Sequence, residues 1–240
     1  MKAIILAAGR SSRLYPITLE KPKCLLEVGG RRIIDRQIAA IREIGIKDIL
    51  IVVGYKGDVI KDDLGNSVRY REYHDYNKTN NLHTLWSVKD ELQSDFLCFF
   101  SDVLFDSELI KKAKDSIQDF CMIIDTSRVL EGTMRVTIKD GKLTAIGSQV
   151  SISNASGNFI GIAKFTKAGA NKLVKQMEKM ISGYHDDYYT MAIDILAKKG
   201  TEIGYVDVGN GNWIEVDTKE DFERANQLFS SNSKGKRVNK

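Results

Sequence analysis

Residues 2–14 read KAIILAAGRSSRL and join a short apolar run to a loop of small residues. The apolar run predicts a buried strand, and the small side chains after it let backbone N–H groups come close to a phosphate. Arg13 follows, and its guanidinium can bind phosphate through two hydrogen bonds. The loop matches neither the Walker A motif nor Gly-x-Gly-x-x-Gly. We expect a phosphate-binding loop of another type, formed by Leu6, Ala7, Ala8, Gly9, Arg10, Ser11 and Ser12.

Short apolar runs alternate with longer helical patterns along the chain. This alternation predicts an α/β fold with a doubly wound, Rossmann-like and mostly parallel sheet. The turn at Asp140 and Gly141 predicts a hairpin, so the second half should add antiparallel strands to a mixed sheet. The predicted strands are 2–6, 48–53, 68–72, 96–100, 120–125, 135–139, 143–147, 159–165, 204–208 and 213–216. The predicted helices are 33–44, 59–63, 84–92, 107–116, 167–180, 188–198 and 218–229.

The chain has no evident linker or internal repeat, which favours a single domain over residues 1–229. Within it we expect a nucleotide-binding half over about 1–119 and a subordinate substrate lobe over about 120–229. Residues 230–240 are predicted to form a flexible basic tail. Such a sheet binds its ligands at the carboxyl ends of its strands, so the residues that follow the strands are the first to consider.

Charge excludes some functions. The 240 residues carry 36 bases and 32 acids, a net charge of +4, but four of the bases follow Ser233, where there is no acid. Residues 1–233 therefore hold 32 bases (36 minus 4) and 32 acids, without the basic surplus that a nucleic-acid partner requires.

The compartment follows from two further features. The first apolar run is too short for a signal peptide, and no stretch reaches the roughly 20 apolar residues of a membrane helix. We therefore expect a cytoplasmic protein without integral membrane contact. Cys24, Cys98 and Cys121 fit no zinc-binding spacing and are predicted to be buried free thiols.

A second basic element lies shortly after the first loop. Residues 20–23 read EKPK, with Lys21 and Lys23 on either side of a proline that fixes the local backbone. Each piece alone is compatible with an ordinary surface turn. Together, the loop of small residues, Arg13 and a rigidly presented Lys23 predict a cradle for a polyphosphate.

Residues 2–25 have the form KAIILAAGxxSRLxPxTxxKPKxL, in which x stands for any residue. This run resembles the signature of nucleotidyltransferases, which join a nucleoside triphosphate to a phosphorylated small molecule. The resemblance continues at 53–55, 80–82, 101–102, 157–162 and 213–218. The chain looks most like the branch that includes cytidylyltransferases for phosphocholine, inositol 1-phosphate and aminoethylphosphonate. One departure is Ser11, where many relatives have glycine.

Two aspartates are predicted to lie at strand ends. Asp102 follows the strand predicted at 96–100, and Asp217 ends another strand-like segment. Converging carboxylates can hold Mg²⁺, which prefers oxygen ligands, and the resemblance implies that these two residues are the metal ligands. The alternative for either is a strand-end turn or a helix N-cap. Glu215 lies on the same strand face as Asp217 and is expected to assist the metal or the substrate, or to be structural.

The resemblance implies that Gly54, Tyr55, Asn80 and Asn81 surround the nucleotide base, with CTP as the favoured nucleotide. Amide side chains can distinguish the amino group of cytosine from the carbonyl of uracil. The alternative for Asn80 or Asn81 is that it only caps the following helix.

For the acceptor, residues 184–189 and Trp213 combine aromatic rings with acids, a composition that suits an ammonium group. A plain helix start explains the segment equally well. Arg135 is a further candidate, as a ligand of the acceptor phosphate or as a solvated strand charge, and Arg128 is a weaker candidate of the same kind. The predicted acceptor-binding residues are Arg135, Asp186, Asp187, Tyr189, Trp213 and Glu215.

The sequence as a whole predicts a Mg²⁺-dependent cytidylyltransferase that transfers CMP from CTP to a small phosphorylated alcohol or phosphonate. Arg13 and Lys23 are the predicted catalytic residues. One alternative keeps the fold but uses a sugar 1-phosphate with UTP, dTTP or GTP. Another is a non-catalytic ligand-binding protein, which is expected to lack a cradle or metal residue, yet Arg13, Lys23, Asp102 and Asp217 are all present. The sequence favours no oligomeric state.

Overall fold

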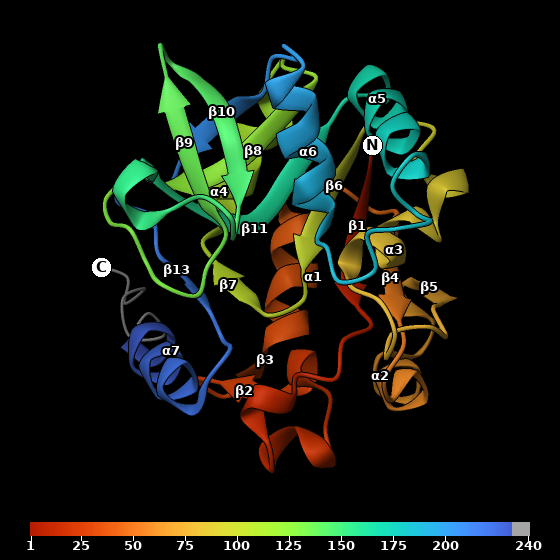
Figure 1. The fold of residues 1–240 in the computed structure, drawn as a ribbon. Helices are drawn as coiled ribbons and strands as arrows, with labels where there is room; N and C mark the ends of the chain where they lie inside the picture. Colours follow the sequence, from red (N-terminus) through yellow and green to blue (C-terminus); the bar gives the residue numbers. More distant parts are fainter. Residues whose placement is uncertain (232–240) are drawn as a thin grey trace.

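A nine-stranded mixed sheet forms the centre of the molecule in the computed structural model, which describes residues 1–231 (Figure 1). The strand order is β10-β9-β11-β6-β1-β4-β5, and β8 pairs with β11 and β12 beside this path. β6, β1, β4 and β5 are parallel, whereas β11 is antiparallel to β6. The strands are β1 (Lys2–Ala7), β4 (Ile49–Val53), β5 (Arg69–Glu72), β6 (Phe96–Phe100), β8 (Phe120–Asp125), β9 (Arg135–Lys139), β10 (Lys142–Gly147), β11 (Gly157–Phe165) and β12 (Gly204–Asp207). The predicted α/β class with a mostly parallel mixed sheet is confirmed, as is the hairpin between β9 and β10.

Two small antiparallel sheets accompany the central one. β2 (Glu27–Val28) pairs with β3 (Arg31–Arg32), and β7 (Val103–Phe105) pairs with β13 (Trp213–Glu215). Our sequence analysis did not predict β2, β3 or β7, because strands of two or three residues show no alternation of apolar and polar residues. The β7–β13 pair matters for the site, since it joins a segment near the C-terminus to the end of β6.

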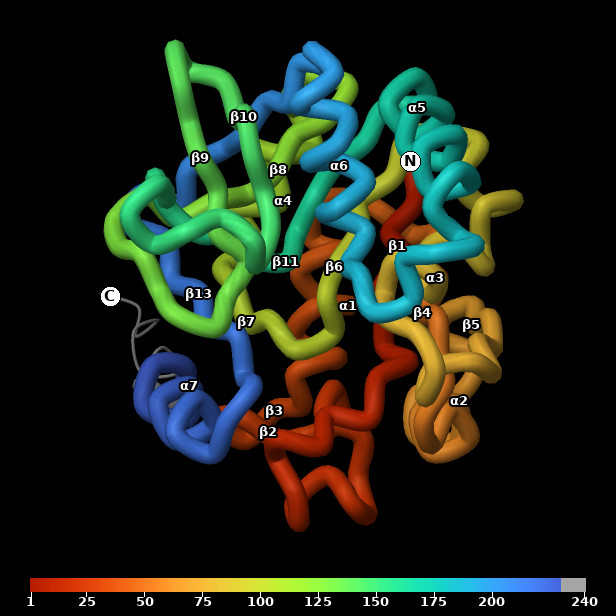
Figure 2. Tube along the Cα trace, in the orientation of Figure 1, coloured from red at the N-terminus to blue at the C-terminus, as the bar shows by residue number. Residues whose placement is uncertain are grey.

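Helices pack around the sheet in two groups. α3, α5 and α6 contact one another, while α1 contacts α4. α7 packs on β2 and β13, so that residues from both ends of the chain lie side by side at the lower end of Figure 2. The helices are α1 (Ile33–Glu43), α2 (Gly57–Leu64), α3 (Asn81–Trp86), α4 (Ser107–Asp115), α5 (Lys167–Glu178), α6 (Tyr189–Lys198) and α7 (Lys219–Ser231).

The helix predicted at 84–92 was wrong in both bounds. Asn80 caps α3, so the helix starts at Asn81, earlier than the apolar pattern indicated. The helix ends at Trp86, and Val88, at φ −109° and ψ 27°, no longer has helical geometry. A separate 3₁₀ turn follows at Lys89–Glu91.

The larger of two apolar clusters among the described residues extends through residues 1–119 and 120–229 alike, because β11 from the second segment lies beside β6 from the first. Every residue of β4, β6 and β8 is buried, as expected for strands covered on both faces. The three cysteines are buried and free, as predicted. Burial raises the pKa of the Cys24 and Cys98 thiols to about 12, so both stay protonated at neutral pH.

At the C-terminal end, α7 runs through Ser231, two residues into the predicted basic tail. The rest of that tail lies outside the described residues. Within residues 1–231, no helix combines the length and the apolar character that crossing a membrane requires.

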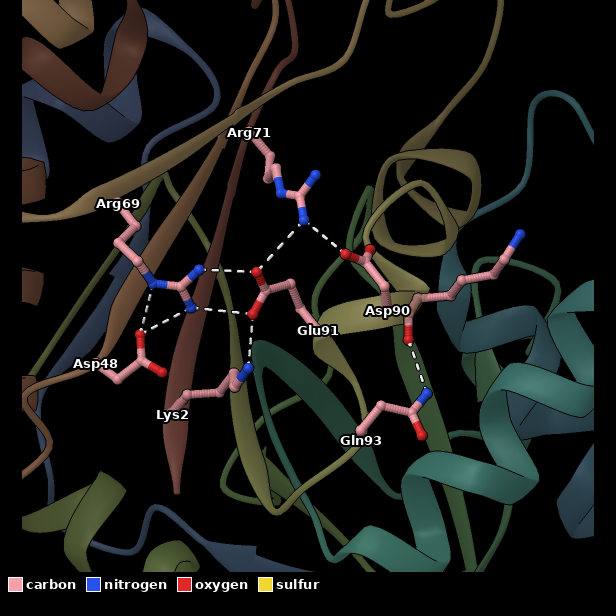
Figure 3. Close-up of polar contacts among 8 residues, drawn as sticks. Lys2, Asp48, Arg69, Arg71, Asp90, Glu91 and Gln93 are labelled. Carbon is pink, nitrogen blue, oxygen red and sulfur yellow. Dashed lines mark hydrogen bonds and ion pairs between the residues drawn. The ribbon is translucent and has the colours of Figure 1, made fainter.

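A charge cluster joins the amino ends of the parallel strands (Figure 3). Glu91, just before β6, pairs with Lys2 Nζ of β1 at 2.6 Å and with Arg69 Nη1 of β5 at 2.7 Å. Arg69 also reaches Asp48 at 2.8 Å. The Arg69 hydrogen bonds outweigh burial and, with Lys2, lower the pKa of Glu91 to about 2 from an ordinary 4.5. The cluster thus holds the sheet together at the end opposite to its carboxyl edge.

We expect Glu91→Gln to lower the free energy of unfolding by about 1–2 kcal/mol at pH 7, a value discounted for the partial exposure of Arg69. Because the pKa of Glu91 is lowered on folding, its stabilisation is complete above about pH 4.5 and is lost as the pH falls towards 2. The difference in the free energy of unfolding between wild type and variant, measured by urea denaturation, should therefore shrink as the pH falls below 4.5. Asp90→Asn, which breaks only the exposed pair with Arg71, is the control and should change stability by less than about 0.5 kcal/mol. A difference that stays constant with pH would contradict this explanation.

Candidate active site

A cavity lies at the carboxyl ends of β1 and β6, where sheets of this class bind ligands. We call it the first cavity. Its wall combines the loop after β1, the segment around Lys23, the start of α3 and the ends of β6 and β13. The lining residues are Leu6, Ala7, Ala8, Gly9, Ser11, Arg13, Pro22, Lys23, Cys24, Tyr76, Thr79, Asn80, Asn81, Thr84, Phe100, Ser101, Asp102, Tyr188, Glu215 and Asp217.

The loop after β1 is held in shape by close backbone contacts. Tyr55 donates its backbone N–H to Ala8 O at 3.0 Å, and a Cβ at Gly54 would lie 2.8 Å from that same oxygen. Ser11 has φ 52° and ψ 45°, in the left-handed region, and its carbonyl accepts a hydrogen bond from Thr18 Oγ1 at 2.9 Å. Glycine adopts this conformation without steric cost, which explains the preference for glycine that we noted at this position.

Four charged side chains meet in the first cavity. Lys23 Nζ lies 2.7 Å from Asp102 Oδ2 and 2.7 Å from Asp217 Oδ1, and Arg13 Nη2 lies 2.9 Å from Asp217 Oδ2. Pro22 precedes the 3₁₀ turn Lys23–Leu25 and directs the lysine into the cavity, where its side chain is 9% exposed. Burial by itself lowers the pKa of Lys23. Asp102 and Asp217 together raise it by more than burial lowers it, so the net pKa lies above its ordinary value. Lys23 is therefore a fixed cation at neutral pH.

The pairing of β7 with β13 brings a third carboxylate to this cluster. Glu215 is opposite Val103 in the register, and Val216 donates its N–H to Asp102 O at 3.0 Å. As a result, oxygen atoms of Asp102, Glu215 and Asp217 lie within 4.8 Å of one another. Burial, with Asp102 and Asp217 close by, raises the pKa of Glu215 to about 8.

These three carboxylates fit a divalent cation. Asp102 Oδ1 is buried and has no hydrogen-bond partner among the described residues, a costly arrangement unless a ligand satisfies it. Hard oxygen donors of this type suit Mg²⁺. Without a metal, Lys23 and Arg13 provide the positive charge that the acidic cluster needs.

A second cavity, of about 710 Å³, adjoins the first. The two share Arg13, Glu215 and Asp217, so the acidic cluster lies at their junction. The remaining wall comes from residues 128–133, β13 and α7. Its other lining residues are Arg128, Leu130, Glu131, Gly132, Thr133, Trp213, Ile214, Thr218, Asp221, Arg224, Gln227 and Leu228.

The residues predicted to surround a nucleotide are partly brought together. Leu6, Ala7, Ala8, Gly9, Ser11, Asn80 and Asn81 line the first cavity. The residues outside that lining are Arg10, Ser12, Gly54 and Tyr55. Tyr55 instead lies beside Arg10, whose Cζ is 5.8 Å from the centroid of the tyrosine ring. Asn80 Oδ1 caps α3, and Asn81 Oδ1 accepts the N–H of Tyr189 at 2.9 Å. The capping role that we considered as an alternative is therefore present for Asn80.

Four of the residues predicted to bind the acceptor do not reach the second cavity. Tyr189 is fully buried in the core, because it begins α6 facing the sheet. Asp186 and Asp187 offer backbone carbonyls to Asn80 Nδ2 and Leu82 N, which fixes that loop against α3. Arg135 donates to the carbonyls of Val150 at 2.5 Å and Ser148 at 2.8 Å. Trp213 and Glu215 do line the second cavity.

Sequence reasoning missed several lining residues. Tyr188 lines the first cavity in place of Tyr189, since it is the N-cap of α6 and has extended rather than helical geometry. The exact start of the helix, not the composition of the segment, decides which tyrosine faces the cavity. Thr79 and Thr84 also line the first cavity. Thr79 directly precedes Asn80 and Thr84 lies one helical turn after it, so their spacing could have identified them as lining residues.

The comparisons with known proteins agree with this geometry. The family model described as nucleotidyl transferase matches residues 2–133. A CTP:phosphoglutamine cytidylyltransferase from Campylobacter jejuni is 27% identical over 93% of this chain and 98% of its own length. A UTP–glucose-1-phosphate uridylyltransferase from Haloferax volcanii is 26% identical over 95% of this chain and 96% of its own. The solved structure of CTP:phosphocholine cytidylyltransferase from Streptococcus pneumoniae superimposes with a TM-score of 0.79 at 25% identity, covering 95% of this chain and 98% of that one.

A loop of small residues and an acidic cluster at the carboxyl edge of a mostly parallel sheet are the features expected of an enzyme that handles nucleotides. More particularly, the chain belongs to the nucleotidyl transferase family. The expectation of an enzyme of this family, with cytidylyltransferases among its relatives, is confirmed.

Removal of the buried cation should destabilise the fold. We expect Lys23→Met to lower the free energy of unfolding by about 2 kcal/mol, because Asp102 and Asp217 then lose their main counter-charge in a partly buried site. Millimolar Mg²⁺ should raise the Tm of this variant more than that of wild type, since the divalent ion then has no lysine to displace. Thermal denaturation with and without Mg²⁺ measures both effects.

Lys21→Met is the matched control, because Lys21 lies two residues away and has only a loose contact of 3.9 Å with Glu27. It should leave both Tm and the response to Mg²⁺ unchanged. Equal stability of the Lys23 and Lys21 variants would show that Lys23 does not neutralise the cluster.

Proposed function

We propose that this nucleotidyltransferase transfers CMP from CTP to a small phosphorylated acceptor and releases pyrophosphate. The observation that carries the proposal is the junction of the two cavities at Arg13, Glu215 and Asp217. A nucleotide on the loop after β1 and an acceptor in the second cavity would meet at this point. The reaction needs such a meeting of two polyanions beside cationic groups.

The triphosphate binds along the loop from Ala7 to Arg13. Small side chains let the backbone N–H groups of the loop approach phosphate oxygens, and the guanidinium of Arg13, 61% exposed, is accessible to a ligand. Arg13 then stabilises the charge on the β and γ phosphates, and Lys23 stabilises the charge on the α-phosphate.

Asp102 and Asp217, with Glu215 beside them, are the residues that would hold Mg²⁺. When bound, this ion supplies Lewis-acid stabilisation of charge on the α-phosphate. The unpaired Oδ1 of Asp102 and the convergence of three carboxylates support this assignment.

The chemistry is an in-line displacement. An anionic oxygen of the acceptor phosphate or phosphonate forms a bond to the α-phosphorus, and the bond from that phosphorus to the oxygen bridging to the β-phosphate breaks. The electron pair leaves with pyrophosphate. No general base is required, because a phosphate monoester is already anionic near neutral pH, so the residues act by orientation and charge stabilisation.

The choice of CTP rests on relatives whose names specify it, the phosphoglutamine and phosphocholine cytidylyltransferases. Asn80 and Asn81 lie on the wall of the first cavity, but Asn80 Oδ1 and Asn81 Oδ1 already accept backbone N–H groups, so the preference for cytosine rests on the relatives. The second candidate function is uridylyl transfer to a sugar 1-phosphate, favoured by the similarity to the Haloferax volcanii enzyme over nearly the whole chain.

A grid of nucleotides and acceptors tests the donor. We expect pyrophosphate release with Mg²⁺ and CTP to exceed release with UTP, dTTP, ATP or GTP by at least about 10-fold in kcat/KM, since a polar pocket rejects a base with the wrong donor and acceptor pattern. The acceptors should include phosphorylated alcohols, phosphorylated amino acids, aminoethylphosphonate and sugar 1-phosphates. Activity confined to UTP or dTTP with a hexose phosphate would replace this proposal by the second candidate.

Two substitutions test the catalytic roles. Lys23→Ala and Asp102→Asn should each lower kcat by at least about 10²-fold, as expected when a main electrostatic stabiliser of the transition state is lost. Steady-state pyrophosphate release measures the change. Asp186→Asn is the control: its side chain is exposed outside the first cavity, so its kcat should stay near wild type. A variant of Lys23 or Asp102 with wild-type turnover would remove that residue from the mechanism.

A further inference from the structure

The aromatic wall of the second cavity is already covered by a cation of the protein itself. Arg128 Cζ lies 5.6 Å from the ring centroid of Trp213, and both residues line this cavity. The indole of Trp213 is largely buried, and its Nε1 donates to Asp125 Oδ2 at 2.8 Å. The ring face that could have received an ammonium group of the acceptor is therefore in contact with the Arg128 guanidinium.

Arg128 is held in this position by several contacts. Asp125, only 3% exposed, lies 3.3 Å from Arg128 Nε and also accepts the N–H of Ser127 at 2.9 Å. Asn158 Nδ2 donates to the backbone carbonyl of Arg128 at 2.8 Å. With Nε facing Asp125 and the side chain still 51% exposed, the two Nη groups are the part of the guanidinium available to a ligand.

The other arginines of the cavity have partners of their own, and Glu131 is an exposed acid in the same wall. Arg13 pairs with Asp217, and Arg224 forms an ion pair with Asp221, whose other oxygen accepts from the N–H of Thr218. Asp217 and Glu215 belong to the acidic cluster at the junction. Arg13 and Arg224 contact their acids through Nη2, whereas Arg128 contacts Asp125 through Nε and lies beside Trp213.

We propose that Arg128 determines acceptor specificity by pairing with a carboxylate at the end of the acceptor remote from its phosphate. The inference rests on the proposed function, because the acceptor phosphate must lie at the junction for its other end to reach this wall. A planar guanidinium with open Nη groups binds a carboxylate through two hydrogen bonds. The same residue disfavours a quaternary ammonium acceptor by repulsion and by covering Trp213.

Two commercially available acceptors form a matched pair for the test. O-phosphoserine and phosphoethanolamine differ only by the carboxylate, and phosphocholine adds the quaternary ammonium. With CTP and Mg²⁺, we expect kcat/KM to fall in the order phosphoserine, phosphoethanolamine, phosphocholine. The kcat/KM for phosphoserine should exceed that for phosphoethanolamine by about 10- to 100-fold, the discrimination that a charge-assisted hydrogen-bonded pair provides.

Substitution of Arg128 then links the preference to the residue. Arg128→Ala should reduce the ratio of phosphoserine to phosphoethanolamine activity by about 10-fold or more and raise phosphocholine activity, because the Trp213 face is uncovered. Arg128→Lys should keep part of the preference, since it retains the charge but not the planar fork. Arg71→Ala is the control: Arg71 is similarly exposed and pairs with Asp90, at the opposite end of the sheet, so all ratios should stay unchanged.

The outcomes separate this inference from the proposed function. CTP-dependent activity that prefers phosphocholine, phosphoethanolamine or an acceptor with no charge beyond its phosphate, such as inositol 1-phosphate, would overturn the role of Arg128 but leave cytidylyl transfer intact. A carboxylate preference that survives Arg128→Ala would also overturn it. Absence of pyrophosphate release from CTP with every acceptor, or release only from another nucleotide, would contradict the proposed function itself.

Discussion

The ion cluster of Lys23 with Asp102 and Asp217 is the contact on which the rest of the site depends. It joins three segments that are far apart in the sequence: the turn after the first loop, the end of β6 and the end of β13. Each carboxylate alone would be costly to hold in a partly buried cavity, and so would the lysine. Their mutual neutralisation makes the arrangement stable at the carboxyl edge of the sheet.

The parallel pairing of the central strands makes this convergence possible. Parallel pairing of β1 with β4 and β6 brings their carboxyl ends to one edge, and the Glu91 cluster ties the amino ends together. The short β7–β13 pair then adds Glu215 and Asp217 beside Asp102. Rigid strands thus position the acidic groups, while the basic groups come from the loop and turn that follow β1.

The sequence predicted much of this arrangement, because the relevant signals are local. A strand followed by small residues, and an acid directly after a buried strand, specify where Lys23 and Asp102 must lie once the sheet is parallel. The acceptor side was less predictable. Whether Tyr188 or Tyr189 faces a cavity depends on one residue at a helix start, and the contact of Arg128 with Trp213 joins segments about 85 residues apart. No periodicity within either segment encodes that contact.

The charge balance of the junction decides which ions it can bind. Asp102 and Asp217 balance the two cations, Lys23 and Arg13, while Glu215, whose pKa is raised to about 8, is mostly protonated at neutral pH. A divalent cation bound to these oxygens would release the proton of Glu215 and add positive charge to the junction. The net charge of the junction would then be positive, which would favour the binding of phosphate groups. A cluster composed only of basic residues would bind the anions at once, but would offer no oxygen ligands for the metal.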